Sequence, residues 1–278
     1  MEKSIARLVP TGAVNRRSPD HANRMIVTGE DYAAISPFLT LVEDWFRAPA
    51  GFPTHPHRGM QTVTFVLDGA LEHRDHTGGH GVLRQGDVQW MTAGHGVMHS
   101  ELPHERETAH TLQLWLNLPS RQKMIPARYV NQLGAEVPAV KLPGAEIRLY
   151  AGKLGEVAAT HGSDWPMTLL DIRAEGGASV ALEVPAADRG FIHLLEGEAD
   201  IGAGRAHVRA GDVAWFEPTE GGNGYDTLRL EARVKLRALL YSSPPIDEPV
   251  VAYGPFVMNS EAEIHAAFDD YRAGRFVA

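Results

Sequence analysis

The stretch HPHRGMQTVTFVLDG, residues 55–69, is the most informative segment of this 278-residue chain. It joins a His-x-His pair, His55 and His57, to a run of β-branched and aromatic residues, Gln61–Leu67, which predicts a strand. Asp68-Gly69 then predicts a tight turn followed by a returning strand. Because alternate side chains of a strand share a face, the His-x-His pair presents two imidazoles to one side.

A second pair of the same spacing follows at His99 and Glu101. If the two strands face each other inside a barrel, three imidazoles and one carboxylate converge. Such a donor set suits Fe(II), Mn(II), Co(II), Ni(II), Cu(II) or Zn(II). Octahedral coordination would leave two positions open for water, O2 or a substrate oxygen. Either pair alone would be interpreted as ordinary polar residues at the protein surface, so the metal-site hypothesis depends on the two pairs together.

The second half of the chain repeats the pattern of the first. Residues 191–195 followed by Gly197 resemble residues 64–67 followed by Gly69, and a Gly-Asp-Val turn occurs at both Gly86 and Gly211. The paired glycines are 128 and 125 residues apart. Closely spaced short strands and this repeat predict an all-β protein of two similar β-barrel or jelly-roll domains.

The boundary between the domains is predicted in the segment 131–146, which carries two Pro and two Gly. The expected domains are therefore 1–130 and 131–278. A helix is expected near the C-terminus, where Ser260 and Glu263 form a capping box. Its apolar face and its end are predicted from Ile264, Ala267, Phe268, Tyr271 and Gly274.

Composition narrows the class of protein. The formal net charge of −9 argues against direct nucleic-acid binding, because phosphate contacts need clustered Lys and Arg. The absence of Cys excludes disulfides and thiolate ligands, so any metal needs nitrogen and oxygen donors. The N-terminal residues lack a signal-peptide core, and no apolar stretch reaches transmembrane length. The expectation is a cytoplasmic protein without membrane contact.

The chain resembles the pirin family of the cupin superfamily. The resemblance is carried by residues 51–59 (GFPTHPHRG), 88–101 (VQWMTAGHGVMHSE), 112–119 (LQLWLNLP) and 254–259 (GPFVMN). It implies two stacked cupin barrels with iron in the first, and a tail that packs back against the N-terminal domain. The metal ligands of the family fall on His55, His57, His99 and Glu101.

One position departs from the family pattern. Many cupins place a ligand Glu shortly after His-x-His, whereas this chain has Gln61 there. The carboxylate ligand must then be Glu101, and the more positive site would favour anionic substrates or water deprotonation. Gln61 could instead only hydrogen-bond a ligand or a neighbouring strand.

Other residues are candidates for supporting roles. Gln113 could hydrogen-bond a ligand or bind water at the barrel mouth. Phe52 and Met98 could line a pocket or belong to the core. A solvated loop is favoured over a second metal site for the polar group that follows the expected hairpin, His73, Asp75, His76 and His80.

Three functions fit this site. The resemblance to bacterial pirins implies a quercetin 2,3-dioxygenase, with a phenolic substrate, O2 and Fe(II). Our hypothesis for the catalytic base is Glu101, which would shift from metal ligand to take the proton of the substrate hydroxyl. The resemblance to animal pirins implies an iron-dependent regulatory module that binds a protein partner. A purely structural metal fits less well, because structural sites tend to be closed.

One metal per chain is expected. Aligning the repeats by their glycines places Glu183 and Pro185 where the His-x-His pair stands. Aligning them by the Gly-Asp-Val turns places Gly224 and Asp226 opposite His99 and Glu101. No four-ligand set survives in the second half.

Overall fold

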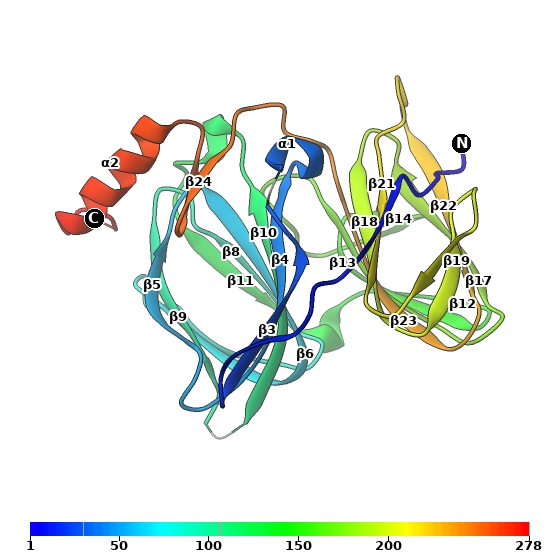
Figure 1. The fold of residues 1–278 in the computed structure, drawn as a ribbon, viewed down its shortest axis with the longest axis horizontal. Coiled ribbons are helices and arrows are strands. Elements are labelled where there is room, and N and C mark those ends of the chain that lie inside the picture. Colours follow the sequence, from blue (N-terminus) through cyan, green and yellow to red (C-terminus); the bar gives the residue numbers. More distant parts are fainter. Residues whose placement is uncertain (30, 106, 278) are drawn as a thin grey trace. The chain divides into compact units, whose positions relative to one another are not determined.

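The computed structural model describes residues 1–29, 31–105 and 107–277. The chain divides into two compact units. The N-terminal unit contains residues 12–136 and 246–278, and the C-terminal unit contains residues 1–11 and 137–245. Each unit is built of β-strands (Figure 1), which confirms the predicted all-β class. Among the described residues, no helix is long and apolar enough to cross a membrane.

The N-terminal unit is a barrel of two sheets. One sheet has the order β11-β8-β6-β10-β4-β3-β2, and the other pairs β5, β9, the second half of β6 and β7. The strands are β2 (Asn15–Ser18), β3 (His21–Val27), β4 (Phe38–Arg47), β5 (Phe52–His57), β6 (Met60–Asp75), β7 (His80–Arg84), β8 (Val88–Thr92), β9 (Val97–Pro103), β10 (Thr108–Asn117) and β11 (Arg128–Gln132). Short helical segments are α1 (Tyr32–Ile35), η1 (Ser120–Gln122) and η2 (Gly134–Glu136).

Strand β6 corrects the expected hairpin. Asp68-Gly69 is not a turn, because β6 runs unbroken through it. Gly69 has φ +74°, and the pairing with β10 shifts register between His110 and Thr111, which marks a bulge. A Cβ on Gly69 would lie 1.9 Å from the Thr108 carbonyl oxygen, so only glycine fits. The bulge allows one strand to pair in both sheets.

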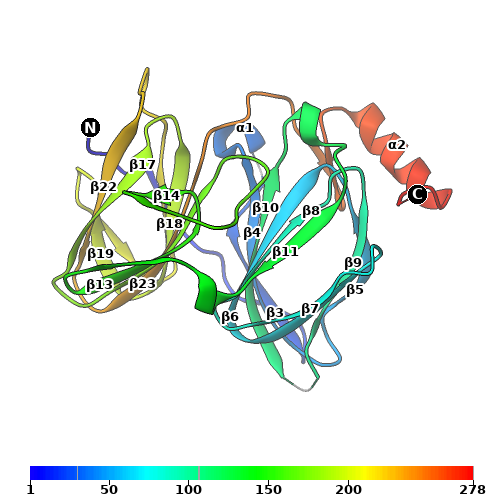
Figure 2. The same cartoon turned by 180° about the vertical axis from the view of Figure 1, so that it is seen from behind.

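The C-terminal unit repeats this order. Its large sheet runs β1-β21-β18-β23-β16-β13-β12, and its small sheet runs β17-β22-β19-β20 (Figure 2). The strands are β1 (Arg7–Pro10), β12 (Ala139–Leu142), β13 (Ala145–Ala151), β14 (Lys153–Leu154), β15 (Val157–Ala158), β16 (Thr168–Ala174), β17 (Ser179–Pro185), β18 (Arg189–Glu196), β19 (Glu198–Ile201), β20 (Ala206–Arg209), β21 (Asp212–Phe216), β22 (Tyr225–Ala232) and β23 (Leu236–Ser243). The matching strand order confirms the predicted duplication.

The expected domain boundaries need correction at both termini. β1 pairs with β21, so the first residues belong to the C-terminal unit rather than to domain 1–130. The tail, residues 246–278, belongs to the N-terminal unit rather than to domain 131–278. It carries β24 (Val251–Tyr253), β25 (Phe256–Met258) and α2 (Glu261–Arg272). Neighbouring strands, not chain order, therefore determine the two units. The expected linker 131–146 also contains strand residues.

Helix α2 begins as its capping box predicts. The Ser260 hydroxyl accepts a hydrogen bond from the backbone N–H of Glu263. Ile264 and Ala267 are buried against Phe256 and Met258, whereas Tyr271 is 43% exposed. Tyr271 is therefore at the edge of the predicted apolar face. The helix fastens the tail to the N-terminal barrel.

The interior of the C-terminal barrel is aliphatic. Along β17 the inward positions are Val180, Leu182 and Val184, all fully buried, whereas Glu183 is exposed. The alignment that placed Glu183 and Pro185 opposite the His-x-His pair therefore does not bring Glu183 to the inward face of this barrel.

The other predicted counterpart, Asp226, binds the Met1 amino group at 2.8 Å and lies 3.6 Å from Lys3. It therefore holds the N-terminal segment against β22. One metal per chain stays a prediction.

Candidate metal centre

Strand pairing brings the two predicted ligand pairs together. In the antiparallel β5–β9 ladder, His55 lies directly opposite His99, and His57 lies opposite Val97. Opposite residues of such a ladder have neighbouring side chains on one face. The same alternation that was expected from His-x-His therefore places three imidazoles on one side of two paired strands.

The three rings converge closely. One ring nitrogen from each of His55, His57 and His99 lies within 4.8 Å of the others. The ring centroids are 4.4 Å apart for His55 and His99, and 4.8 Å apart for His55 and His57. His55 is half-buried, and its Nδ1 lies 2.8 Å from the Pro53 carbonyl oxygen, which leaves Nε2 for the centre.

Two of these imidazoles are buried and lack hydrogen bonds. His57 and His99 are 2% and 1% exposed. Within the described residues, neither ring nitrogen of His57 nor Nε2 of His99 has a partner at good hydrogen-bond geometry, and the Pro255 backbone is only a minor influence on the pKa of His57. Burial, with a contribution from His55, lowers the pKa of His57 to about 3, and burial together with the neighbouring histidines holds the pKa of His99 well below its ordinary value.

These observations test whether the residues fit a metal. A buried nitrogen without a partner costs about 1–3 kcal/mol, and neutral imidazole is the form that binds metals. The lowered pKa values keep both rings neutral at physiological pH. A divalent cation coordinated by the converging nitrogens would satisfy them, so the donor set fits a metal of the imidazole-binding class.

Glu101 lies beside this cluster and is held in place. Its Oε1 accepts a hydrogen bond from Thr64 Oγ1 at 3.2 Å, and its Oε2 accepts one from Gln113 Nε2 at 2.8 Å. The Gln113 Oε1 accepts in turn from Trp115 Nε1 at 3.1 Å, and the Trp115 ring meets His57 edge-on at 5.0 Å. The structure thus places Gln113 against the predicted carboxylate ligand.

The ligand atoms of Glu101, His99 and His73 also lie within 4.8 Å of one another, although the sequence placed His73 in a solvated loop. His73 is fully buried in β6, so its expected position in a solvated loop is wrong. The returning strand expected after Gly69 ran from Ala70 to Arg74 and already contained His73. Its alternation with the buried Leu71 puts His73 on the inward face.

Gln61, Met98 and Phe52 have different surroundings. Gln61 is buried and donates to Thr92 Oγ1 of the neighbouring strand β8 at 3.2 Å. Met98 packs against the tail cluster around Phe256, on the face of β9 opposite to its neighbour His99, so it does not line the ligand side. The Phe52 ring lies 6.0 Å from the His55 ring.

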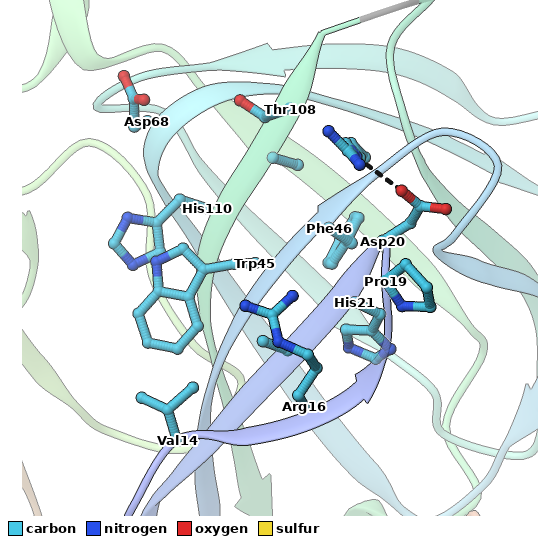
Figure 3. A pocket seen from close by; sticks show the side chains of 13 residues that line it. Val14, Arg16, Pro19, Asp20, His21, Trp45, Phe46, Asp68, Thr108 and His110 are labelled. Carbon is cyan, nitrogen blue, oxygen red and sulfur yellow. Dashed lines mark hydrogen bonds and ion pairs between the residues drawn. The ribbon is translucent and has the colours of Figure 1, made fainter.

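A separate hollow of about 720 Å³ is lined by residues of β3, β4 and β10 (Figure 3). His110 and Trp45, which line it, stack at 4.8 Å. His21 also lines it, binds Asp44 Oδ1 at 2.7 Å, and contacts Phe52 edge-on at 5.7 Å. None of the four predicted ligands lines this hollow, and Phe52 contacts both His21 and His55.

Comparison with known proteins identifies the family. The pirin family model matches residues 23–116, and the pirin C-terminal cupin domain model matches residues 169–277. Pirin-like protein 2 of Arabidopsis thaliana is 38% identical, over 95% of this chain and 80% of its own length.

Two crystal structures are similar over the whole fold. A protein of Geobacillus kaustophilus is 39% identical with a TM-score of 0.86, over 90% of this chain and 99% of that one. A quercetin 2,3-dioxygenase from Acinetobacter baumannii is 29% identical with a TM-score of 0.88, over the full length of both chains. The chain belongs to the pirin family and consists of two cupin domains in tandem.

Proposed function

We propose that this pirin is a metal-dependent dioxygenase of the quercetin 2,3-dioxygenase type, with one divalent metal held by His55, His57, His99 and Glu101. The observation that carries the proposal is the convergence of three imidazoles, two of which are buried with nitrogens that find no hydrogen-bond partner in the described part of the chain. The name of the similar Acinetobacter baumannii protein supports a flavonol as the substrate.

The chain's own residues would prepare the site for this chemistry. Burial keeps His57 and His99 neutral and therefore able to donate lone pairs. The half-buried His55 lies on the accessible side of the cluster. A bound metal, iron by the family resemblance or another metal of the imidazole-binding class, would coordinate the substrate oxygen and supply the redox chemistry toward O2.

Glu101 is the group proposed to move a proton. A flavonol carries an acidic hydroxyl next to a carbonyl, and this hydroxyl must lose its proton to bind as an anion. The bonds from Thr64 and Gln113 fix the Glu101 carboxylate, and its remaining lone pairs can accept that proton. Phe52, beside His55, offers an apolar contact for a flat aromatic substrate.

The expected result in air is that metal-loaded protein consumes quercetin and O2 together, with ring opening and release of carbon monoxide. Glu101→Ala should lower the rate by about 10²–10⁴-fold, the usual contribution of a general base. The flavonol absorbance measures the consumption of quercetin, and oxygen uptake measures the consumption of O2. Glu183→Ala, which removes an exposed glutamate of the C-terminal unit, is the matched control and should retain full activity.

Metal occupancy is measured on every sample. If fully loaded wild-type protein changes neither absorbance nor oxygen above the Glu101→Ala level, the dioxygenase proposal fails for this substrate. The iron-dependent regulatory module would then be the better account.

A further inference from the structure

Behind His99, on the side away from His55 and His57, lies a buried chain of polar side chains. His99 Nδ1 faces His73 Nδ1 at 3.5 Å, and His73 Nε2 faces Asp75 Oδ2 at 3.4 Å. The side chains of His73 and Asp75 are 0% and 3% exposed. Strand pairing produces this arrangement, because Asp75 lies opposite His99 and His73 lies opposite Glu101 in the β6–β9 ladder.

The positions of the protons in the series Asp75, His73 and His99 are determined by the groups at its two ends, Asp75 and His99. At one end, the Asp75 carboxylate accepts from Thr77 N–H at 2.7 Å, Thr77 Oγ1 at 2.6 Å and Gly79 N–H at 3.0 Å, all through Oδ1. Its Oδ2 is therefore an acceptor for His73 Nε2–H. A neutral His73 with its proton on Nε2 has a lone pair on Nδ1.

That lone pair accepts the proton of His99 Nδ1–H. A neutral His99 protonated on Nδ1 has its own lone pair on Nε2, which is the nitrogen that lacks a hydrogen-bond partner. Each N–H in the series Asp75, His73 and His99 then donates toward Asp75, and each faces an acceptor. The free lone pair of His99 points away from His73, toward the nitrogens of His55 and His57.

A competing interpretation makes His73 a ligand, since His73, His99 and Glu101 also bring ligand atoms within 4.8 Å. The hydrogen bonds decide against it. Both ring nitrogens of His73 already have partners, His99 Nδ1 and Asp75 Oδ2. Among the described histidines of the two groups, His57 and His99 are the ones with buried nitrogens that lack a hydrogen-bond partner. A cation would therefore bind on the side of His99 that faces His55 and His57, and not on the side of His73.

We infer that Asp75 and His73 are positioning residues that fix the tautomer and ring orientation of His99 for metal binding. This inference rests on the metal centre of the proposed function, but not on its substrate. Outer partners of ligand histidines typically contribute 10–100-fold to metal affinity. An imidazole takes this role here because the His73 ring, and not the Asp75 carboxylate, lies against His99 Nδ1, while the carboxylate contacts the other nitrogen of His73.

The test measures Co(II) affinity by chelator competition, together with the visible spectrum of bound Co(II). His73→Leu should weaken binding about 10–100-fold. His73→Asn should restore most of the affinity, because its Oδ1 can occupy the place of Nδ1 and accept from His99. His80→Leu is the control, since His80 lies on the same hairpin, half-exposed, and should bind as wild type.

Asp75→Asn tests the proton chain with the smallest change of shape. An amide N–H₂ facing His73 cannot accept from Nε2–H, so His73 must carry its proton on Nδ1, where it opposes His99 Nδ1–H. Affinity should fall at least 10-fold and the Co(II) spectrum should shift. Wild-type affinity and spectrum in both Asp75→Asn and His73→Leu would overturn the inference. These outcomes are independent of quercetin turnover.

Discussion

His57→Ala is expected to abolish tight metal binding while the protein stays folded. The variant removes one of the three converging nitrogen donors and leaves only His55 and His99 in this group. Since losing an outer partner of a ligand costs roughly 10–100-fold in affinity, losing the ligand itself should cost more than about a hundredfold. Elemental analysis after dialysis measures the retained metal.

The fold should persist for two reasons. The C-terminal barrel has the same strand order around an aliphatic interior, so the architecture does not need a metal. Without a metal, His57 is a buried group whose nitrogens lack good hydrogen bonds to the described residues. Its removal therefore relieves about 1–3 kcal/mol of desolvation, while the cavity left behind costs a similar amount.

Circular dichroism should therefore match wild type. His80→Ala, which removes an exposed histidine, serves as the control and should retain the metal. Wild-type protein should hold one metal per chain. Undiminished metal in His57→Ala would contradict the ligand assignment, and two tightly held metals in wild type would contradict the single site.

The part of the centre that follows from local periodicity could be predicted from the sequence. His-x-His and His-x-Glu specify side chains on one face of a strand whatever the partner strand is, and β5 and β9 show that arrangement. The same rule decides between the two alternatives left open for Met98, because as the neighbour of His99 it must face the other way and so belongs to the core rather than to a pocket beside the ligands.

The unbroken course of β6 through Gly69 could not be predicted for a different reason. Asp-Gly is a strong turn signal, and the alternative, a glycine bulge inside one long strand, becomes visible only when the close approach of the Thr108 carbonyl to Gly69 is known. The docking of the tail is equally non-local, because it joins Val257 to residues near position 59, almost two hundred residues earlier. Neither contact leaves a periodic trace in the sequence.

The contact of the tail with the ligand segment depends on one buried lysine. Lys123 is 1% exposed, and its Nζ donates to Gly59 O at 2.9 Å, Asn117 Oδ1 at 2.7 Å and Val257 O at 3.0 Å. Gly59 lies two residues after His57, and Val257 belongs to β25. This ammonium group therefore joins the ligand-bearing segment, the end of β10 and the tail.

Lys123→Met is expected to destabilise the N-terminal unit, although two effects oppose each other. Burial lowers the pKa of Lys123 to about 8, which corresponds to a penalty of roughly 3 kcal/mol for the charged form at neutral pH, and methionine removes that penalty. The same change leaves three oxygens without their buried donor, at about 1–3 kcal/mol each. The second effect is larger, so the free energy of unfolding should fall by about 2–4 kcal/mol.

The dependence on pH separates these effects. A lysine whose pKa is lower in the folded protein binds fewer protons when folded, so wild-type stability gains from Lys123 as pH rises from about 8 toward the ordinary value of 10.5. Methionine lacks this gain, and the difference between the two proteins should be larger at pH 9.5 than at pH 7. Urea unfolding of Lys123→Met, with the exposed Lys153→Met as control, measures both values. A variant as stable as wild type at pH 7 would mean that relief of desolvation outweighs the three lost hydrogen bonds, and that apolar packing holds the tail in place.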